Sequence, residues 1–172
     1  DWTTAFNVTN LSMQEYGYRP KVTATTTDAT VAFLSGDGSG GPMFSRDLDL
    51  GSNQWDAAYA TSQTIGIVSM NEATIGDRVY MFYAQEPQLA DNHQYQSFYF
   101  TQRQQNDAAW SQPVFVTETT LGLGYTYMSN RMVAQNGSVY FLINCNYNFF
   151  IPPELQSCWL PSLTLWSYSP SS

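Results

Sequence analysis

The sequence predicts an all-β protein, a β-propeller built of about three four-stranded blades. Trp2, Trp55 and Trp110 each open a segment made of Trp, two further residues, a small residue or Pro, and then a strand-like stretch. The intervals between these tryptophans are 53 and 55 residues, which indicates a repeat architecture. No segment has helical spacing, and the strand-like segments come in groups of four. Four strands with one recurring aromatic residue are typical of a propeller blade.

The first predicted unit has three strands followed by the strand that Trp55 opens. β-Branched and aromatic residues fill these segments, and Gly, Asp, Asn and Ser bound them, as in all-β proteins. The three strands are residues 21–26, 30–35 and 42–48, separated by a turn at Thr27-Asp28 and a glycine-rich loop at 36–41.

The second and third predicted units follow the same plan. Strands at 64–70, 78–84 and 95–103 precede the Trp110 strand, and strands at 128–134, 138–144 and 163–168 form the third unit. A turn at Gln135-Asn136-Gly137 joins the first two of these. The predicted blades are residues 18–61, 62–117 and 125–172 plus a strand at 2–9, all in a single domain of residues 1–172.

The order of the predicted strands leaves the last blade one strand short. The first predicted strand matches the fourth strand of a blade, and the last predicted strand matches the third. The last blade therefore lacks a fourth strand, which is the strand that Trp2 supplies. Propellers typically have four to eight blades, so three blades do not close a ring. We therefore expect half of a six-bladed ring that another chain or fragment completes, for example a homodimer whose copies exchange their first strands.

Composition disfavours several classes of partner. The net charge is -8, only 12% of the residues are charged, and Lys and Arg form no cluster. A nucleic acid or an anionic membrane surface would require clustered basic residues, so neither is an expected partner. The longest apolar runs fall short of the roughly 18 to 20 residues of a membrane span, so no span is expected.

Short motifs indicate a secreted glycoprotein. Asn7, Asn10 and Asn136 each begin an acceptor triplet for N-glycosylation. Cys145 and Cys158 could close a short loop as a disulfide, or could be two buried free thiols. The chain begins at Asp1, without an initiator Met, which favours a processed or trimmed product.

One resemblance implies sugar binding. The stretch 67–70 (Ile-Val-Ser-Met), followed by 77–85 (Asp-Arg-Val-Tyr-Met-Phe-Tyr-Ala-Gln), resembles blades of fungal fucose-specific lectins, six-bladed propellers with sugar sites between blades. In that family a strand-borne Arg, a Glu or Gln on the next strand and an aromatic residue from the neighbouring blade hold the sugar. The resemblance implies these roles for Arg78, for Gln96, and for Trp110 or Tyr127. Thr30 and Ser138 replace Arg78 in the other units, so at most one such site is implied.

A second resemblance implies glycoside hydrolysis. Tyr18-Arg19-Pro20, and Ser45-Arg46-Asp47 with Gly51 and Trp55, resemble the opening of a sialidase propeller with its Arg motif and a loose Asp box. A sialidase clamps a carboxylate with three arginines and uses a Tyr nucleophile activated by a Glu, with an acid/base Asp. The candidates are Arg19, Arg46, Arg78, Arg103 and Arg131, Tyr80 with Glu72 or Glu86, and Asp28 or Asp37.

The residues favour binding over catalysis. Twelve Tyr and five Trp offer surfaces on which sugar rings stack, although the periodic Trp2, Trp55 and Trp110 suit packing between blades. No cofactor is expected; Asp47, Asp49 and Asn53 could bind calcium, but such a turn needs no ion. We favour a secreted carbohydrate-binding protein with glycans as partners, ahead of a sialidase-like hydrolase and of a structural or adhesive extracellular propeller.

Overall fold

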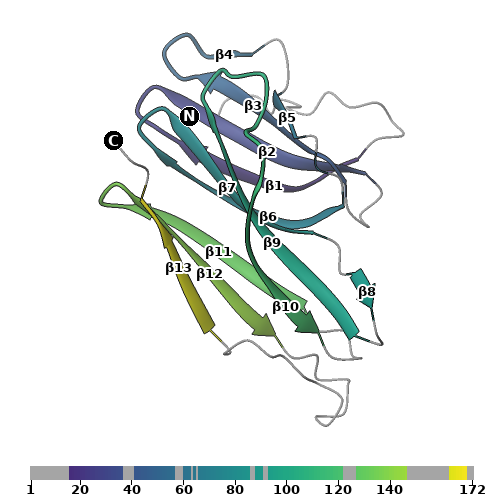
Figure 1. Ribbon diagram of the computed structural model, residues 1–172. Helices are drawn as coiled ribbons and strands as arrows, with labels where there is room; N and C mark the ends of the chain where they lie inside the picture. The colour runs from purple at the N-terminus through teal and green to yellow at the C-terminus, as the bar shows by residue number, and fades with distance from the viewer. Residues whose placement is uncertain are drawn as a thin grey trace.

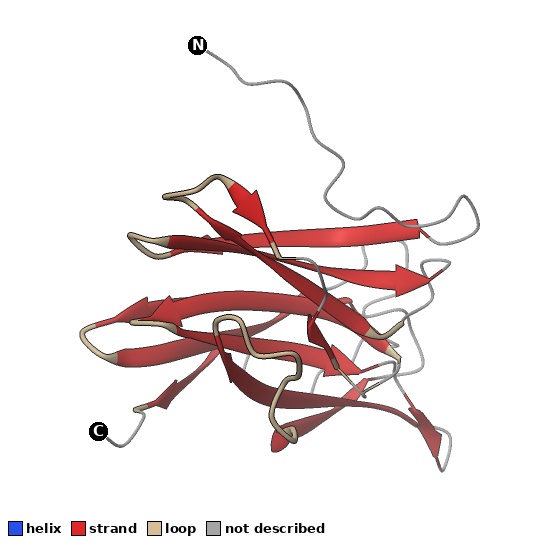
Figure 2. Ribbon diagram, turned by 90° about the horizontal axis from the view of Figure 1, so that it is seen from above, coloured by secondary structure: helices blue, strands red, loops and turns tan. Residues whose placement is uncertain are grey.

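Three antiparallel sheets make up the structure. It is a computed structural model that describes residues 16–36, 41–56, 60–62, 64, 66–85, 88–90, 93–121, 127–146 and 163–169. None of the described residues is helical, which agrees with the all-β prediction. The first sheet lies at the top of Figure 1, the second runs through the middle and the third lies at the bottom. Figure 2 shows the layers from above.

The first sheet is a meander of neighbouring hairpins. Its strands follow chain order, with β1 at one edge, and two short strands share the other edge by pairing with β3. The predicted Trp55 strand is described in two parts, Gln54–Trp55 and Ala60–Thr61, and both parts pair with β3. The strands are β1 (Tyr16–Ala24), β2 (Asp28–Gly36), β3 (Met43–Asp49), β4 (Gln54–Trp55) and β5 (Ala60–Thr61).

The second sheet repeats the meander. β6 runs past its predicted end at Met70 to Ile75, because the hairpin turn falls at Gly76-Asp77, where Gly76 has a φ of 61°. The short β8, which the sequence did not predict, pairs with β9. The strands are β6 (Ile67–Ile75), β7 (Arg78–Gln85), β8 (Gln88–Ala90), β9 (His93–Gln104) and β10 (Val114–Leu121).

The third sheet has three described strands, β11 (Tyr127–Gln135), β12 (Ser138–Asn146) and β13 (Leu163–Tyr168). Asn136 and Gly137 form the two-residue turn between β11 and β12, as the sequence predicts, with φ values of 51° and 74°. Two left-handed residues at the centre define a type I′ hairpin turn. The predicted strand at residues 2–9 lies outside the described residues.

The stability of the protein should depend on Gly137 in the β11–β12 turn. We expect Gly137→Ala to lower the free energy of unfolding by about 1 kcal/mol, because an L side chain with a Cβ is strained at positive φ. Urea unfolding followed by circular dichroism measures the change. Gly137→Asn should cost less, since Asn tolerates the left-handed region; an equal loss for both variants would contradict this explanation.

The second sheet is buried on both faces. Successive β7 side chains alternate, so Val79, Met81 and Tyr83 contact the first sheet while Tyr80 and Phe82 contact the third. Aromatic stacking fixes the second contact, with the rings of Phe82 and Phe141 4.8 Å apart between centroids. The first contact is completed by Ala32, Leu34, Met43, Ile67, Met70 and Trp110, and the second by Ala84, Phe98, Phe100, Val139, Phe141 and Ile143.

The first strands of the three sheets lie next to one another. β6 contacts both β1 and β11. The hydroxyls of Thr23 on β1 and Thr74 on β6 are 3.3 Å apart, and the Thr74 hydroxyl donates to the carbonyl of Ala24 at 3.3 Å. All three meanders therefore start on one side of the molecule and run outward from it.

Candidate functional site

A polar hollow opens where β9 turns toward β10. Its volume is about 260 Å³. Arg78 at the start of β7 reaches it because Arg78 pairs with Gln104 near the end of β9. The hollow is lined by Arg78, Gln102, Arg103, Gln104, Asp107, Ala109, Trp110 and Ser111.

The walls of the hollow are held by local hydrogen bonds. The Gln104 side-chain amide donates to the Asp77 carboxylate at 2.8 Å, and the Gln104 backbone N–H donates to the Asp107 carboxylate at 3.3 Å. Ser111 N–H donates to the Gln102 carbonyl at 2.8 Å, and Gln102 N–H donates to the Ser111 hydroxyl at 3.2 Å. These contacts hold the Gln104 amide, the Asp107 carboxylate and the Ser111 hydroxyl in place before any ligand binds.

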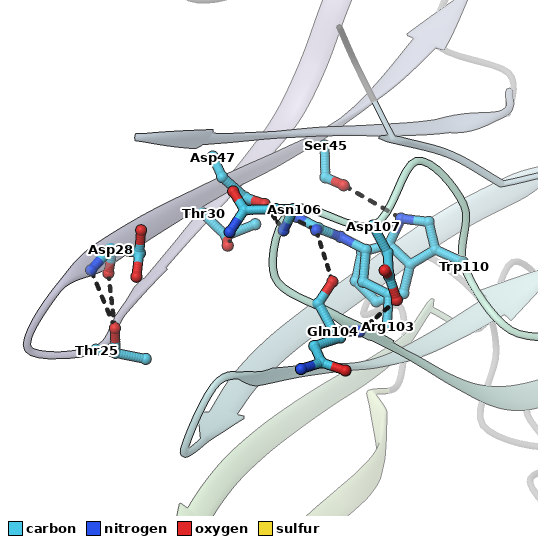
Figure 3. Close-up of polar contacts among 10 residues, drawn as sticks. All are labelled: Thr25, Asp28, Thr30, Ser45, Asp47, Arg103, Gln104, Asn106, Asp107 and Trp110. Atoms are coloured by element: carbon cyan, nitrogen blue, oxygen red, sulfur yellow. Dashed lines mark hydrogen bonds and ion pairs between the residues drawn. The ribbon is translucent and has the colours of Figure 1, made fainter. Parts of the chain in front are cut away.

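A buried ion pair lies behind the hollow, between the first and second sheets. The Arg103 guanidinium donates to both carboxylate oxygens of Asp47, at 2.6 and 2.8 Å. The Thr30 hydroxyl at 2.6 Å and the Asn106 N–H at 2.9 Å donate to the same carboxylate. Figure 3 shows these side chains together. Burial alone would raise the pKa of Asp47, but these hydrogen bonds outweigh it and hold the pKa below its ordinary value.

The ion pair also positions Trp110. The Arg103 guanidinium lies 5.3 Å from the centroid of the Trp110 ring, within range of a cation–π interaction. The Trp110 indole N–H donates to the Ser45 hydroxyl of β3 at 3.2 Å, and the residue is 8% exposed. The recurring tryptophan of the second sheet thus packs against the preceding sheet, as its periodicity predicts, while its edge lines the hollow.

Glu72 adds a buried carboxyl group to the interface between the first and second sheets. Both of its carboxylate oxygens are buried and have no hydrogen-bond partner among the described residues. Burial raises the pKa of Glu72 to about 8, against the opposing effect of Arg103. The Arg103 Nε is likewise buried without a partner in the described part of the chain. The site therefore favours a protonated Glu72 at neutral pH.

The structure brings Arg78 together with Trp110, one of the two alternatives for the aromatic residue that the lectin resemblance implies. Arg78 and Trp110 both line the polar hollow. Gln96 lies eight positions before Gln104 on β9, roughly 26 Å away at the usual strand rise, and its amide donates to the Gln85 carbonyl at 3.2 Å. Tyr127 begins β11 in the third sheet, and its side chain lies outside the described part. Arg78 and Trp110 therefore lie at one hollow, and Gln96 lies apart from them.

The residues that the sialidase resemblance implies are dispersed. Glu72 and Tyr80 lie on opposite faces of the second sheet, because Glu72 pairs with Met81 and Tyr80 pairs with Ala73. This separation argues against them as a nucleophile pair. Among the arginines, Arg103 is held by Asp47, and Arg46 donates to the Asp56 carbonyl at 2.6 Å and lies 5.7 Å from the Trp55 ring. Glu86 and Asp37 lie outside the described residues, Asp28 begins β2, and Arg19 and Arg131 are exposed on β1 and β11.

The two carboxylates suggested as calcium ligands, those of Asp47 and Asp49, already accept hydrogen bonds from protein groups. The carboxylate of Asp47 is occupied by Arg103, whereas Asp49 accepts hydrogen bonds from the N–H groups of Gly51 and Ser52 at 2.7 and 3.0 Å. These N–H groups lower the pKa of Asp49. Asn53 belongs to the same turn, with a φ of 56°. Within the described ranges, no three His, Cys, Asp or Glu residues are grouped as metal ligands would be.

The predicted modification sites fall partly within the described residues. Asn136 is exposed at the tip of the β11–β12 hairpin. Cys145 lies on β12, but Cys158, Asn7 and Asn10 lie outside the described residues. The disulfide and the two N-terminal glycosylation sites therefore stay predictions.

Asp47 and Arg103 were separate candidates in the sequence, and their pairing was not predicted. They are 56 positions apart and belong to different sheets. The available signal was the alternation Met43, Ser45, Asp47 on β3, which places a carboxylate on the buried face of a strand and so requires a buried partner.

No protein-family model matches the sequence, and no curated protein matches it. The part of the chain that the structure describes contains no helix that is long and apolar enough to cross a membrane.

Proposed function

We propose that the chain forms three blades of a β-propeller. Each sheet is an antiparallel meander, the sheets pack face to face through two apolar clusters, and their first strands are neighbours. First strands that line a common axis, with later strands farther out, are the arrangement of propeller blades. The buried Trp110 between two sheets supports the same proposal.

We further propose that the protein binds carbohydrate at the polar hollow. The observation that carries this is the mixture of groups around one aromatic edge: the Arg78 guanidinium, two side-chain amides, the Asp107 carboxylate and the Ser111 hydroxyl beside Trp110. Sugar hydroxyls both donate and accept hydrogen bonds, and sugar C–H faces pack on aromatic surface. At about 260 Å³ the hollow lies just below the usual range of pockets for drug-sized ligands, which suits one or two sugar rings.

Binding is a better proposal than hydrolysis. Glycosidases use a pair of carboxyl groups, or a Tyr with a Glu, on either side of the scissile bond. The hollow is lined by a single carboxylate, Asp107, and the suggested pair of Tyr80 and Glu72 faces opposite directions. We also propose that the protein is secreted, which the exposed Asn136 acceptor triplet supports.

A glycan array followed by calorimetry tests sugar binding. We expect at least one class of glycan to bind the native chain, and Arg78→Ala to weaken that binding about tenfold or more, because a hydrogen bond to a charged group contributes about 1.5–3 kcal/mol. Arg131→Ala, which removes an exposed arginine of the third sheet, is the matched control and should leave the affinity unchanged. An array without any bound glycan, or equal effects of the two substitutions, would overturn the proposal.

A further inference from the structure

A second hollow lies between the second and third sheets and is mainly apolar. Its volume is about 260 Å³. Val114 and Phe115 of β10 border it and are 60% and 55% exposed, which is unusual for neighbouring apolar strand residues. The hollow is lined by Phe100, Gln102, Ser111, Val114, Phe115, Val116, Phe141, Ser167 and Tyr168.

The corresponding place between the first and second sheets is filled by Trp110. There, Arg103 of β9 lies over the Trp110 ring. Arg103 pairs with Val79, the second residue of β7. In the third sheet, Tyr168 of β13 pairs with Val139, the second residue of β12. Tyr168 therefore occupies the position in the third sheet that Arg103 occupies in the second. The apolar hollow beside Tyr168 is thus the equivalent of the space that Trp110 fills.

One polar group in the apolar hollow also lacks a partner. Trp110 donates its indole N–H to Ser45, on the third strand of the preceding sheet. In the next interface, Gln102 on the third strand β9 lines the hollow, and its Oε1 is buried without a hydrogen-bond partner among the described residues. An indole N–H is a donor without an acceptor function, so a tryptophan would satisfy this oxygen.

The third sheet also has room for another strand. The first and second sheets have strands beyond their third long strand, β3 or β9, whereas β13 ends the third sheet in the described part of the chain. An unpaired strand edge is a template for pairing with a further strand. A strand that brings a tryptophan and pairs with β13 would fill the hollow, satisfy the Gln102 oxygen and cover this edge.

We infer that the segment Trp2–Thr9 of a second copy of this chain occupies the apolar hollow and pairs with β13. The segment resembles 110–117, since both begin with Trp and have Thr at the eighth position. This inference rests on the proposed propeller architecture and is independent of sugar binding.

The layer order favours a second copy over the same chain. The first and third sheets lie on opposite faces of the second sheet. Residues 10–15 between the segment and β1 span at most about 25 Å, whereas two sheet spacings alone take about 20 Å and the direct path crosses the second sheet.

Exposed apolar residues on the outer faces of the first and third sheets also favour a second copy of the chain as the partner. Thr23 faces β6 and Met132 packs against the core of the second and third sheets, so the neighbouring Val22 and Val133 point away from the second sheet. Val22 is 69% exposed and Val133 is 56% exposed. In a two-copy ring the third sheet of each copy would cover the first sheet of the other, at two equivalent junctions.

The mass of the native particle tests the inference. We expect the full chain to have twice its mass of 19.4 kDa by light scattering and native mass spectrometry. Trp2→Ala and Phe115→Asp should each raise the dimer dissociation constant about 30-fold or more, as loss of a central aromatic anchor does. Leu50→Asp is the matched control, since Leu50 is 45% exposed in the β3–β4 turn and does not line the apolar hollow.

A peptide experiment separates docking from misfolding. A synthetic peptide of residues 1–10 should bind the folded Trp2→Ala chain, and the same peptide with Ala at position 2 should not. A wild-type chain that stays monomeric at every concentration, or a dimer that neither Trp2→Ala nor Phe115→Asp weakens, would overturn the inference. Neither outcome depends on whether a glycan binds, so a failure here is distinguishable from a failure of the proposed sugar site.

Discussion

Replacing Asp47 by Asn is expected to lower the free energy of unfolding by about 3–5 kcal/mol. The substitution keeps the shape of the side chain but removes the charge that Arg103 contacts at 2.6 and 2.8 Å. Arg103 is 3% exposed, so its guanidinium would remain buried without a counter-charge. Urea unfolding at pH 7, followed by tryptophan fluorescence and by circular dichroism, measures the loss.

Asp49→Asn is the matched control for this prediction. Asp49 lies two positions along β3 and is exposed at the strand end, where it accepts hydrogen bonds from Gly51 and Ser52. An Asn oxygen can accept the same bonds, so we expect a much smaller loss of stability than for Asp47→Asn. Similar losses for both variants would show that the Asp47 charge has no special role.

The double substitution Asp47→Leu with Arg103→Met separates the two contributions. Exchanging a whole buried ion pair for apolar residues is often neutral or stabilising, whereas removing one partner is costly. We therefore expect the double variant to be more stable than Asp47→Asn, even though Thr30 and Asn106 lose an acceptor. If the double variant were the less stable of the two, the lost hydrogen bonds would outweigh the unpaired charge.

The positions of the strands were predictable from local pattern, but the residues at which some of them end were not. Alternating residues fix where a strand lies, as for β13, whose range of Leu163–Tyr168 equals the predicted one. The end of a strand depends on where its neighbour turns, so β6 continued to Ile75 once the turn formed at Gly76. Both described parts of the predicted Trp55 strand, β4 and β5, pair with β3.

Only part of the lining of the polar hollow could be named from the sequence. Arg78 and Trp110 were expected at a site, and the structure places both at one hollow. Gln96 was expected with them on the ground that it lies on the next strand, but a twelve-residue strand places its two ends far apart. The hollow instead takes its amides from Gln102 and Gln104, whose contribution follows from the register of β7 with β9.

Glu72 makes stability depend on pH. Its pKa is raised from 4.5 to about 8 in the folded chain, first by burial of the carboxylate, with Asp47 adding to the rise and Arg103 and Lys21 opposing it. Below pH 4.5 the group is protonated in both the folded and unfolded states. Between pH 4.5 and 8 only the unfolded state releases the proton, so the folded state binds more protons and stability falls as pH rises. Above the folded pKa the loss is complete, at up to about 5 kcal/mol.

We expect Glu72→Gln to remove this dependence. The variant should match the wild type within about 1 kcal/mol at pH 4 and exceed its stability by several kcal/mol at pH 9, because Gln resembles the protonated acid and cannot ionise. Unfolding curves at half-unit pH intervals give the difference between the two proteins, in which other titrating groups cancel. Glu118→Gln, at an exposed glutamate of β10 bonded to Ser97, should leave the pH profile unchanged. A Glu72→Gln profile parallel to that of the wild type from pH 4 to pH 9 would mean that the Glu72 carboxylate reaches solvent, and that the interface of the first and second sheets is more open there than its packing indicates.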